Sequence, residues 1–414
     1  MKKFLTFLLC FTFLVSLFTG CSSTSQKSTQ QQVTINIWEQ MEENVDKTFD
    51  ELVKKFEEQN PNIKIKRVHY KTEDLRNQFQ TAVLSGQGPE LIFGPNDNIG
   101  PMSLGNLIFP LDDLLGSEYF QKYDSQVLDT VKLDGKIWAV PLVNGNNISM
   151  LYNKKLVSRA PEKFSEIIEL AKKYNDGKTF ALVYFLNEPY WFVPFLGGFG
   201  GKVFDDKGNI TLNTPEMIKA LKFVQDLKFK YKAVPKDADY NVADTLFKEG
   251  KAAVLLNGAW SFTSYTQVNG LDFDVALFPK IDETGNYCLP YYGSKGFSVS
   301  ANVKDEVVKD AIKRFFDYIA QKDVQVKLSK AFAQMPATKE ALEDPEIKAD
   351  KFIKMSMEQM RHGVAMPIRA EMRAVWDAIR PELENVMAGK KTPEVAAKDM
   401  QTKAEELAKS LTKQ

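Results

Sequence analysis

Residues 187–192 read NEPYWF and place a carboxylate, a proline and three aromatic rings next to one another. A carboxylate accepts strong hydrogen bonds, and tyrosine and tryptophan offer flat apolar faces with little side-chain entropy to lose. Because Pro189 fixes its own φ and favours extended backbone at Glu188, we expect one rigid loop to present Glu188 and Tyr190 together. Either the rings fill a core and the carboxylate reaches water, or the segment forms a recognition surface.

Polar and aromatic residues also follow two apolar strands. Asp97 comes just after the predicted strand 90–93, and Trp260 follows the buried-strand run 251–258, where a loop begins. In α/β sheets, ligand crevices form beyond the C-terminal ends of strands, so both positions are candidates for binding. The alternatives are a turn-capping role for Asp97 and a core position for Trp260. The helical spacing around Trp376 by itself favours a core position for that ring.

The composition excludes several classes of function. Lysine plus arginine and aspartate plus glutamate number 54 each, so the balanced charge gives no reason to expect nucleic-acid binding. Two histidines and three cysteines form no zinc-binding pattern, and neither a G-x-x-x-x-G-K-[ST] loop nor a G-x-S-x-G motif occurs. We therefore expect no catalytic residue, no metal and no cofactor. The length of 414 residues favours two domains or lobes.

The N-terminal segment is typical of an exported protein. Residues 1–20 carry two lysines and then an apolar stretch shorter than the roughly 20 residues that span a bilayer. The step FTGC resembles a bacterial lipobox, which makes Cys21 the predicted lipidated N-terminus; an uncleaved signal anchor is the alternative. Residues 21–32 are rich in serine and glutamine and form a predicted tether. Cys288 is then left alone and is expected to be a buried apolar residue.

The order of apolar patterns predicts an α/β protein. Strands at 33–40 and 63–68 flank a helix at 48–60, and the alternation of helix and strand continues to residue 93. Two strands joined by an Asn/Gly-rich bend at 144–147 follow, and this pair could pass between lobes. The remaining expected elements are helices at 163–174, 215–231, 240–249 and 306–321, a strand at 295–300, and mainly helix after 346.

Five stretches carry a family resemblance: GPELIFGPND, LYNKKLV, LNEPYWFVP, DYNVADTLFKEGKAAVLLNGAW and MPIRAEMRAVWDAIR. They resemble the solute-binding proteins of ATP-driven sugar importers, most closely the maltose/maltodextrin-binding family. NEPY and NGAW are specific to that branch, whereas LYNK and FKEGKAA mark the wider superfamily. The resemblance implies a two-lobed periplasmic-binding-protein fold of type II, each lobe a mixed, mainly parallel sheet flanked by helices, with hinge strands between. The implied N-terminal lobe comprises 33–144 and 297–344, and the C-terminal lobe 145–296 and 345–414.

The resemblance also implies which residues contact a sugar. Asp97 and Asn146 are expected to bind hydroxyls from the first lobe and the hinge, and Glu188 and Tyr190 from the second. Tyr190, Trp260 and Trp376 resemble the platforms on which glucose rings lie. Such a set suits a pyranose, whose C–H faces need flat apolar surfaces and whose edge needs polar groups. The further candidates are Asn98, Trp191, Tyr240, Phe262, Arg380, Glu39, Glu42 and Glu43.

Some features leave alternatives open. Relative to the family, Gly94 and Asn98 replace a tryptophan and an arginine, so the length and linkage of the glucan stay undetermined. The acidic segment 39–44 is also typical of a solvated approach to a helix. Trp38 and Trp138 are interpreted as core residues, because each lies in a strand-like run without turn residues.

The resemblance implies a monomeric receptor, lipid-anchored on the outer face of a bacterial cell membrane. It would bind maltose or maltodextrins between its lobes and deliver them to the transmembrane subunits of an ABC permease. One alternative is a receptor for another oligosaccharide, such as trehalose or a xylo-oligosaccharide. The other is a glycoside hydrolase, since paired carboxylates beside aromatic platforms also describe that class.

Overall fold

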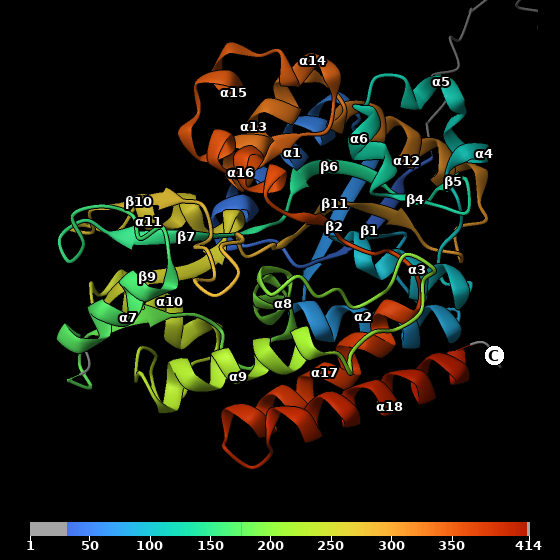
Figure 1. The fold of residues 1–414 in the computed structure, drawn as a ribbon. Helices are drawn as coiled ribbons and strands as arrows, with labels where there is room; N and C mark the ends of the chain where they lie inside the picture. The colour runs from blue at the N-terminus through green and yellow to red at the C-terminus, as the bar shows by residue number, and fades with distance from the viewer. Residues whose placement is uncertain (1–30, 175, 412–414) are drawn as a thin grey trace, which may run out of the picture.

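The computed structural model describes residues 31–174 and 176–411. The predicted signal segment 1–20, Cys21 and most of the predicted tether 21–32 lie outside these residues. Within them, the chain builds two β-sheets flanked by helices, as an α/β protein should (Figure 1). No helix in these two ranges has the length and apolar character needed to cross a membrane.

The first sheet is built mostly from the N-terminal part of the chain and has the order β12-β6-β11-β3-β1-β2, with β13 paired to β11. Alternate residues of β1 are buried, and the apolar face of helix α1 packs on the same core. The elements of this part are β1 Val33–Glu39, α1 Glu43–Gln59, β2 Ile63–His69, α2 Thr72–Leu84, β3 Leu91–Pro95, β6 Val140–Gly145, β11 Tyr291–Val299, α12 Glu306–Ile319, α13 Lys322–Phe332, β12 Met335–Pro336 and β13 Val364–Ala365.

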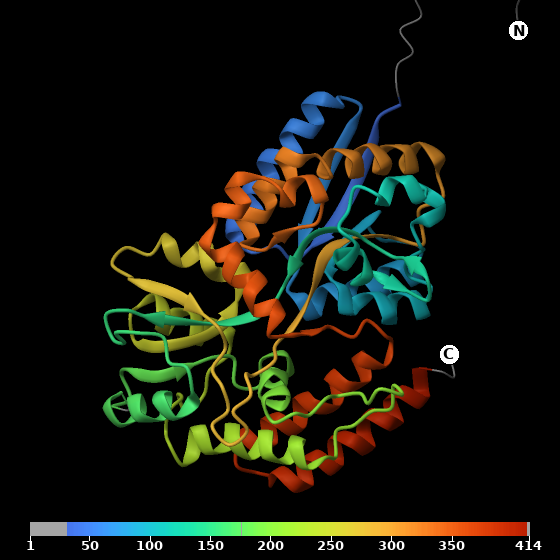
Figure 2. The same ribbon diagram turned by 45° about the horizontal axis from the view of Figure 1, so that its top comes forward.

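The second sheet has the order β10-β7-β9-β8. Every residue of its central strand β9 is buried, because helices cover both faces. Its elements are β7 Ile148–Asn153, α7 Phe164–Lys173, β8 Phe180–Val183, α8 Pro189–Gly198, α9 Pro215–Phe229, α10 Tyr240–Lys248, β9 Ala252–Gly258, β10 Phe273–Ala276, α17 Glu371–Met387 and α18 Pro393–Leu411. The two largest apolar cores are separate, one on each sheet, and Figure 2 shows the two parts side by side.

Shorter elements connect these layers. Two brief 3-10 helices follow strands β3 and β9: η1 Asn96–Asn98 and η2 Ala259–Ser261. The others are α3 Ile99–Leu104, α4 Asp112–Leu115, α5 Ser117–Phe120, α6 Ser125–Asp129, β4 Lys132–Leu133, β5 Lys136–Ile137, α11 Phe262–Thr266, α14 Lys339–Leu342, α15 Pro345–Ala349 and α16 Lys351–Arg361.

Both sheets are mixed, and the expectation of mainly parallel sheets is wrong in that detail. Strand β1 runs parallel to β2 and β3, but β11 runs antiparallel to β3 and β6. In the second sheet β7 is antiparallel to both neighbours, and only β8 and β9 are parallel. Parallel pairing follows from a crossover helix between consecutive strands. Strand β11 enters the first sheet directly from the second part of the chain, so no such crossover fixes its direction.

Two strands link the parts of the molecule. Strand β6 leads into β7 through Asn146 and Asn147, and Asn146 adopts a positive φ of 41°, which asparagine tolerates better than most residues. Strand β11 runs without interruption through the predicted lobe boundary at 296/297. Helix α16 touches strands of both sheets, and Asn147 Nδ2 donates to the Ser356 carbonyl at 2.7 Å. The exact division into lobes remains a prediction.

Candidate functional site

The site lies where strands β3 and β9 end, at the junction of the two sheets. Each strand continues into a short 3-10 helix, and these turns carry Asp97 and Trp260. Helix α8 begins nearby with Glu188 as its capping residue, and helix α17 contributes Trp376. Figure 1 shows α8 between the two sheets, with α17 passing below it. Segments far apart in the sequence therefore meet at one place.

Asp97 is held by the opposite part of the molecule. Its Oδ2 accepts a hydrogen bond of 3.2 Å from Trp376 Nε1, while its buried Oδ1 has no hydrogen-bond partner among the described residues. Burial raises the pKa of the Asp97 carboxyl, and the charge of Arg76 and the Trp376 bond limit that rise. One oxygen is thus positioned by protein and the other remains able to accept a further bond.

Glu188 caps helix α8 rather than lying in a loop, which corrects the sequence-based expectation. Its backbone is extended, as predicted, and Pro189 takes the first helical position, where its fixed φ fits and its missing N–H costs nothing. The Glu188 carboxylate accepts from the Tyr190 backbone N–H at 3.4 Å and from the Arg380 guanidinium. Burial raises the pKa of Glu188, and Arg380 opposes that rise.

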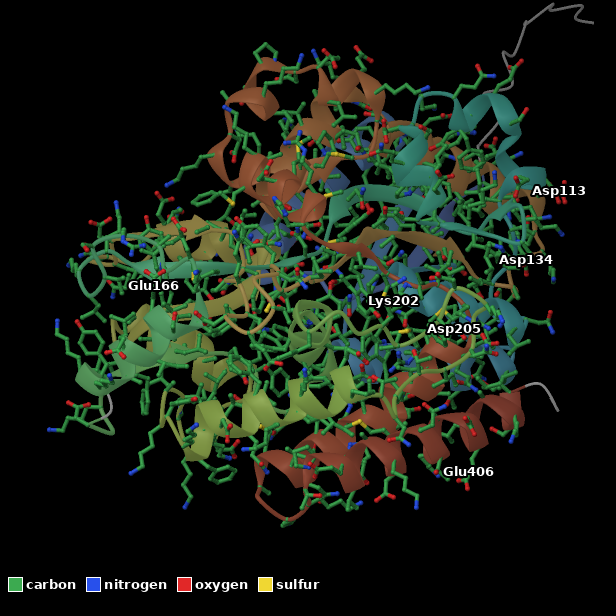
Figure 3. The ribbon with its side chains drawn as sticks, viewed as in Figure 1. Asp113, Asp134, Glu166, Lys202, Asp205 and Glu406 are labelled. Atoms are coloured by element: carbon green, nitrogen blue, oxygen red, sulfur yellow. The ribbon has the colours of Figure 1, made fainter. Side chains whose placement is uncertain are left out.

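Charged residues join the two parts beside this carboxylate. Glu73, on α2 in the first part, accepts from Arg373 on α17 at 3.0 Å and lies 3.7 Å from the guanidinium of Arg380. Arg380 thus faces a carboxylate on each side of the junction, Glu73 and Glu188. Elsewhere charged side chains such as Asp113 and Glu406 are exposed at the periphery (Figure 3). Partly buried ion pairs therefore join the two parts at the junction.

Aromatic rings line the same place. The ring centroid of Tyr190 lies 6.4 Å from that of Trp260 and 6.4 Å from that of Trp376, and each tryptophan is only 6% exposed. Trp191 and Tyr240 stand behind them: Trp191 Nε1 donates to the Leu256 carbonyl at 2.9 Å, and its ring lies 6.1 Å from that of Tyr240. Ring packing, together with the hydrogen bonds of Trp376 and Tyr190, therefore fixes Tyr190, Trp260 and Trp376.

Asn146 and Tyr190 fasten the crossing strands to α8. The Tyr190 hydroxyl donates to the carbonyl of Asn146, with a longer contact of 3.3 Å to the carbonyl of Tyr291. This engagement leaves the Tyr190 ring, rather than its hydroxyl, as the group available for recognition. The Asn146 side-chain Oδ1 is buried and has no partner among the described residues. Unpaired buried acceptors are costly, so Asn146 and Asp97 are suited to receive ligand donors.

Comparisons with known proteins agree with this geometry. A family model described as bacterial extracellular solute-binding protein matches residues 51–354. The chain belongs to this family of solute-binding proteins. A maltotriose-binding protein of Pyrococcus abyssi is 30% identical over 367 residues, covering 87% of this chain and 79% of the relative. A maltooligosaccharide ABC transporter solute-binding lipoprotein of Streptococcus pneumoniae is 26% identical, covering 78% of each chain.

A solved structure extends the match to the fold. It is the maltose/maltodextrin-binding domain of Bdellovibrio bacteriovorus bound to maltotriose, with a TM-score of 0.87 and 36% sequence identity. The match covers 91% of this chain and all of that one. The expected two-lobed binding-protein fold is thereby confirmed, and membership of a solute-binding family agrees with the expectation of a receptor rather than an enzyme.

The acidic segment after β1 lies differently from the sequence-based expectation. Glu39 is 1% exposed and pairs with Arg67 on β2 at 3.1 Å, and Glu43 is exposed beside Lys47. The structure does not bring either carboxylate to the ring cluster. The half-buried Glu42 instead lies within electrostatic reach of Lys295, which sits over the Trp260 ring. Sequence reasoning missed Lys295, because a lysine in an otherwise apolar strand carried no motif.

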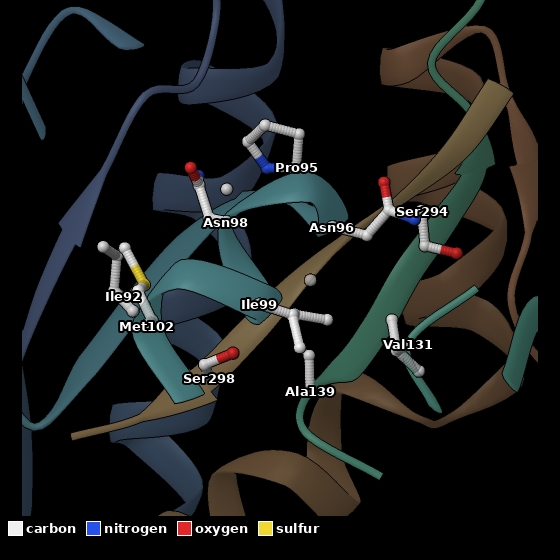
Figure 4. Close-up of a pocket in the computed structure, with 12 residues that line it drawn as sticks. Ile92, Pro95, Asn96, Asn98, Ile99, Met102, Val131, Ala139, Ser294 and Ser298 are labelled. Atoms are coloured by element: carbon white, nitrogen blue, oxygen red, sulfur yellow. The ribbon is translucent and has the colours of Figure 1, made fainter. Parts of the chain in front are cut away.

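The side chain of Asn98 points into the first part of this solute-binding protein. Its Oδ1 accepts from Arg76 Nη1 at 3.4 Å, and the residue lines a small pocket between β3, β11 and α3 (Figure 4). The volume of that pocket is about 20 Å³, which suits about one water molecule rather than a sugar. Phe262 is fully buried against Phe352 in the core beside strand β9, so its side chain is not exposed at the junction.

Proposed function

We propose that this chain captures malto-oligosaccharides between its two lobes and delivers them to an ABC importer. One observation carries the proposal: rings and carboxylates from both parts of the molecule converge on one junction. Asp97 comes from the first part, and Glu188, Tyr190, Trp260 and Trp376 come from the second. Flat rings with carboxylates at their edge match the C–H faces and hydroxyl belt of a glucose polymer.

Two carboxylates and one amide are the proposed hydroxyl acceptors. Asp97 Oδ1 and Asn146 Oδ1 are buried acceptors without protein donors. Sugar hydroxyls would donate to them, and bonds to a charged acceptor contribute about 1.5–3 kcal/mol each. Glu188 would accept from a further hydroxyl while Arg380 holds its carboxylate in place. The platforms proposed for the glucose rings are Tyr190, Trp260 and Trp376.

Closure of the lobes follows from a ligand that contacts both. A sugar bound to Asp97 and to the Trp260 ring at once gains contacts only while the two parts stay together, so it favours the closed arrangement. The contacts of Trp376 with Asp97 and of Arg373 with Glu73 already join the two parts. We propose that the crossing strands β6–β7 and β11 form the hinge. The predicted lobe boundaries are part of this proposal.

The relatives support the choice of ligand and location. The proteins from Pyrococcus abyssi and Bdellovibrio bacteriovorus are named for maltotriose or maltodextrin binding, and the pneumococcal relative is named a lipoprotein of an ABC transporter. We propose that Cys21 carries the lipid, that residues 21–32 tether the folded part to the outer face of the membrane, and that the receptor is a monomer.

Calorimetric titration tests the ligand. Maltotriose is expected to bind, whereas trehalose and xylotriose should bind at least about tenfold more weakly, because each presents its rings and hydroxyls in another geometry. A stronger response to trehalose or xylotriose would overturn the choice of ligand. Chromatography of maltotetraose after long incubation tests the hydrolase alternative, and sustained release of shorter sugars would overturn the receptor proposal.

A further inference from the structure

Lys295 is a largely buried cation beside Trp260. It lies on strand β11, one of the two segments that link the sheets, and it is only 7% exposed. Its Nζ lies 5.0 Å from the centroid of the Trp260 ring and 5.9 Å from that of Phe332. Contacts of this kind attract a cation, but they do not use its N–H donors.

The side chain of Lys295 is largely buried, yet its ammonium has no hydrogen-bonding partner among the described residues. Among the described residues it forms no ion pair within 4.0 Å and donates no hydrogen bond, although Glu42 attracts it at longer range. Burying a charge without a hydrogen-bonded partner is expensive, so such groups usually have a functional explanation. The register of β11 against β6 shifts between Lys295 and Gly296, so the strand is irregular where it carries this side chain.

The surroundings of Lys295 point to a sugar oxygen as the missing acceptor. Trp260 is the platform proposed for a glucose ring, and the edge of a ring on that platform carries hydroxyl oxygens within the reach of a flexible lysine. We propose that Lys295 is a further ligand-binding residue, whose ammonium donates to a hydroxyl oxygen of the sugar ring stacked on Trp260. This inference rests on the proposed function and adds a cationic donor to its carboxylate acceptors.

The opposite charges of Lys295 and Glu42 also bear on whether the ligand is charged or neutral. Lys295 and Glu42 together add no net charge to this end of the site. A neutral glycosyl unit can satisfy the ammonium through its lone pairs without bringing a charge that Glu42 would repel. The inference therefore favours an uncharged oligosaccharide over one with a uronic acid unit beside Lys295, because Glu42 already balances the charge of the ammonium.

Protonation links Lys295 to binding. Burial lowers the pKa of Lys295 to about 8, whereas the charge of Glu42 acts in the opposite direction. Sugar oxygens that accept from the ammonium favour its charged form, so binding near pH 8 should take up a proton. The other charged or titratable groups around Glu42 are His69 on β2 and Tyr240, Asp244 and Lys248 on α10.

Titration of maltotriose into the full folded chain tests this inference. Lys295→Met keeps the length of the side chain but removes the donors, and we expect it to weaken binding by about tenfold or more. Lys295→Arg retains a cation and should recover part of the loss. Lys122→Met is a matched control, because Lys122 also lies over an aromatic ring, 3.9 Å from the centroid of Tyr119, but far from the site. It should bind as the wild type does.

Proton uptake distinguishes ligand binding from a structural role. Titrations near pH 8 in buffers of different ionisation enthalpy should show wild-type uptake of roughly half a proton per sugar, and none in Lys295→Met. If Lys295→Met does not fold, the proton uptake of the wild type on binding maltotriose still tests the role of Lys295. Equal affinity in Lys295→Met, or no uptake in a wild type that binds maltotriose, would overturn this inference alone. Absence of maltotriose binding by the wild type would overturn the proposed function itself.

Discussion

Strands β3 and β9 end in the same way but present different chemistry. Each runs into a 3-10 helix of 3 residues at the junction of the sheets, yet η1 carries a carboxylate in Asp97 and η2 carries a large ring in Trp260. The turn of the first part thus carries a hydrogen-bond acceptor, and the turn of the second part carries a flat apolar ring. The same kind of backbone turn therefore positions two different groups: a carboxylate that can accept directional hydrogen bonds, and a ring that offers a flat apolar face.

The two turns are also held by different means. Around η1, the side chain of Asn96 donates to the Thr130 carbonyl at 2.8 Å, so a neighbouring loop fixes the turn. Around η2, a Cβ added at Gly258 would lie 2.1 Å from the Trp260 ring, so the ring packs directly on bare backbone. Ser261 Oγ donates to the Gly258 carbonyl at 2.7 Å. The acceptor is therefore held by hydrogen bonds and the ring mainly by close packing.

Removing the ring should have the largest effect. Trp260→Ala deletes the platform and is expected to weaken maltotriose binding by about 2 kcal/mol, or roughly thirtyfold, as for buried aromatic hot spots. Calorimetry measures the loss. Trp38→Ala is the control, because Trp38 packs on Tyr70 at 4.9 Å away from the site and should affect stability rather than affinity. Equal losses of affinity in both variants would contradict the platform role.

Changing the carboxylate at the start of α8 should come next. Glu188→Ala removes the acceptor and leaves Arg380 without this partner, and we expect a loss of about 1.5 kcal/mol in sugar binding. Glu188→Gln keeps one acceptor oxygen and should lose less than the alanine variant. Calorimetry on the pair gives the order, and a glutamine variant that binds more weakly than the alanine variant would argue against a hydroxyl acceptor.

Displacing the ring without deleting it should have a smaller effect. Gly258→Ala places a methyl group against Trp260, and the rigid indole must shift, at a cost of about 1 kcal/mol. Sugar affinity should fall severalfold while the ring fluorescence persists. Gly88→Ala is the control, since its Cβ would lie 3.3 Å from Val83 Cγ2 with no ring nearby. Wild-type affinity in Gly258→Ala would show that precise ring placement is unimportant.

Loosening the ion pairs between the two parts should have the smallest effect. Glu73→Gln removes the carboxylate that pairs with Arg373 across the junction, while Asp377 still pairs with Arg373 on helix α17. This should weaken the closed arrangement, but Glu73 is 48% exposed, so at most about 1 kcal/mol is expected. The affinity loss should be greatest at low salt and shrink at high salt, because solvent ions screen such pairs. A loss that is independent of salt would indicate that Glu73 acts otherwise.

Local sequence patterns predicted the helices and strands better than they predicted how the chain is arranged at the junction of the two sheets. Alternation in 33–40 and the helical face of 48–60 predicted the β-α-β unit, because each pattern depends on a single buried face. The direction of β11 could not be predicted, since it depends on how the chain returns from the second sheet. The loop expected at 187–192 is a helix start, because proline favours the first helical turn as readily as a loop.

Candidate residues in motifs were easier to find than residues placed by the fold. Glu188 and Asp97 stand beside turn residues or proline that the sequence shows directly. The spacing around Trp376 is that of a core residue, and only the fold brings its 6% exposed ring to Asp97. Glu39 pairs with Arg67 within the first sheet, whereas Glu42, which follows the end of β1, lies within electrostatic reach of Lys295. The sequence alone does not show which of the two carboxylates approaches Lys295, because this depends on how the chain turns after β1.

A crystal structure of this chain with maltotriose tests the central claim most directly. We predict that glucose rings lie against Trp260, Tyr190 and Trp376, with their hydroxyls on Asp97 and Glu188 from opposite sides of the junction. A sugar bound elsewhere, or one in contact with only one of the two parts, would contradict that claim.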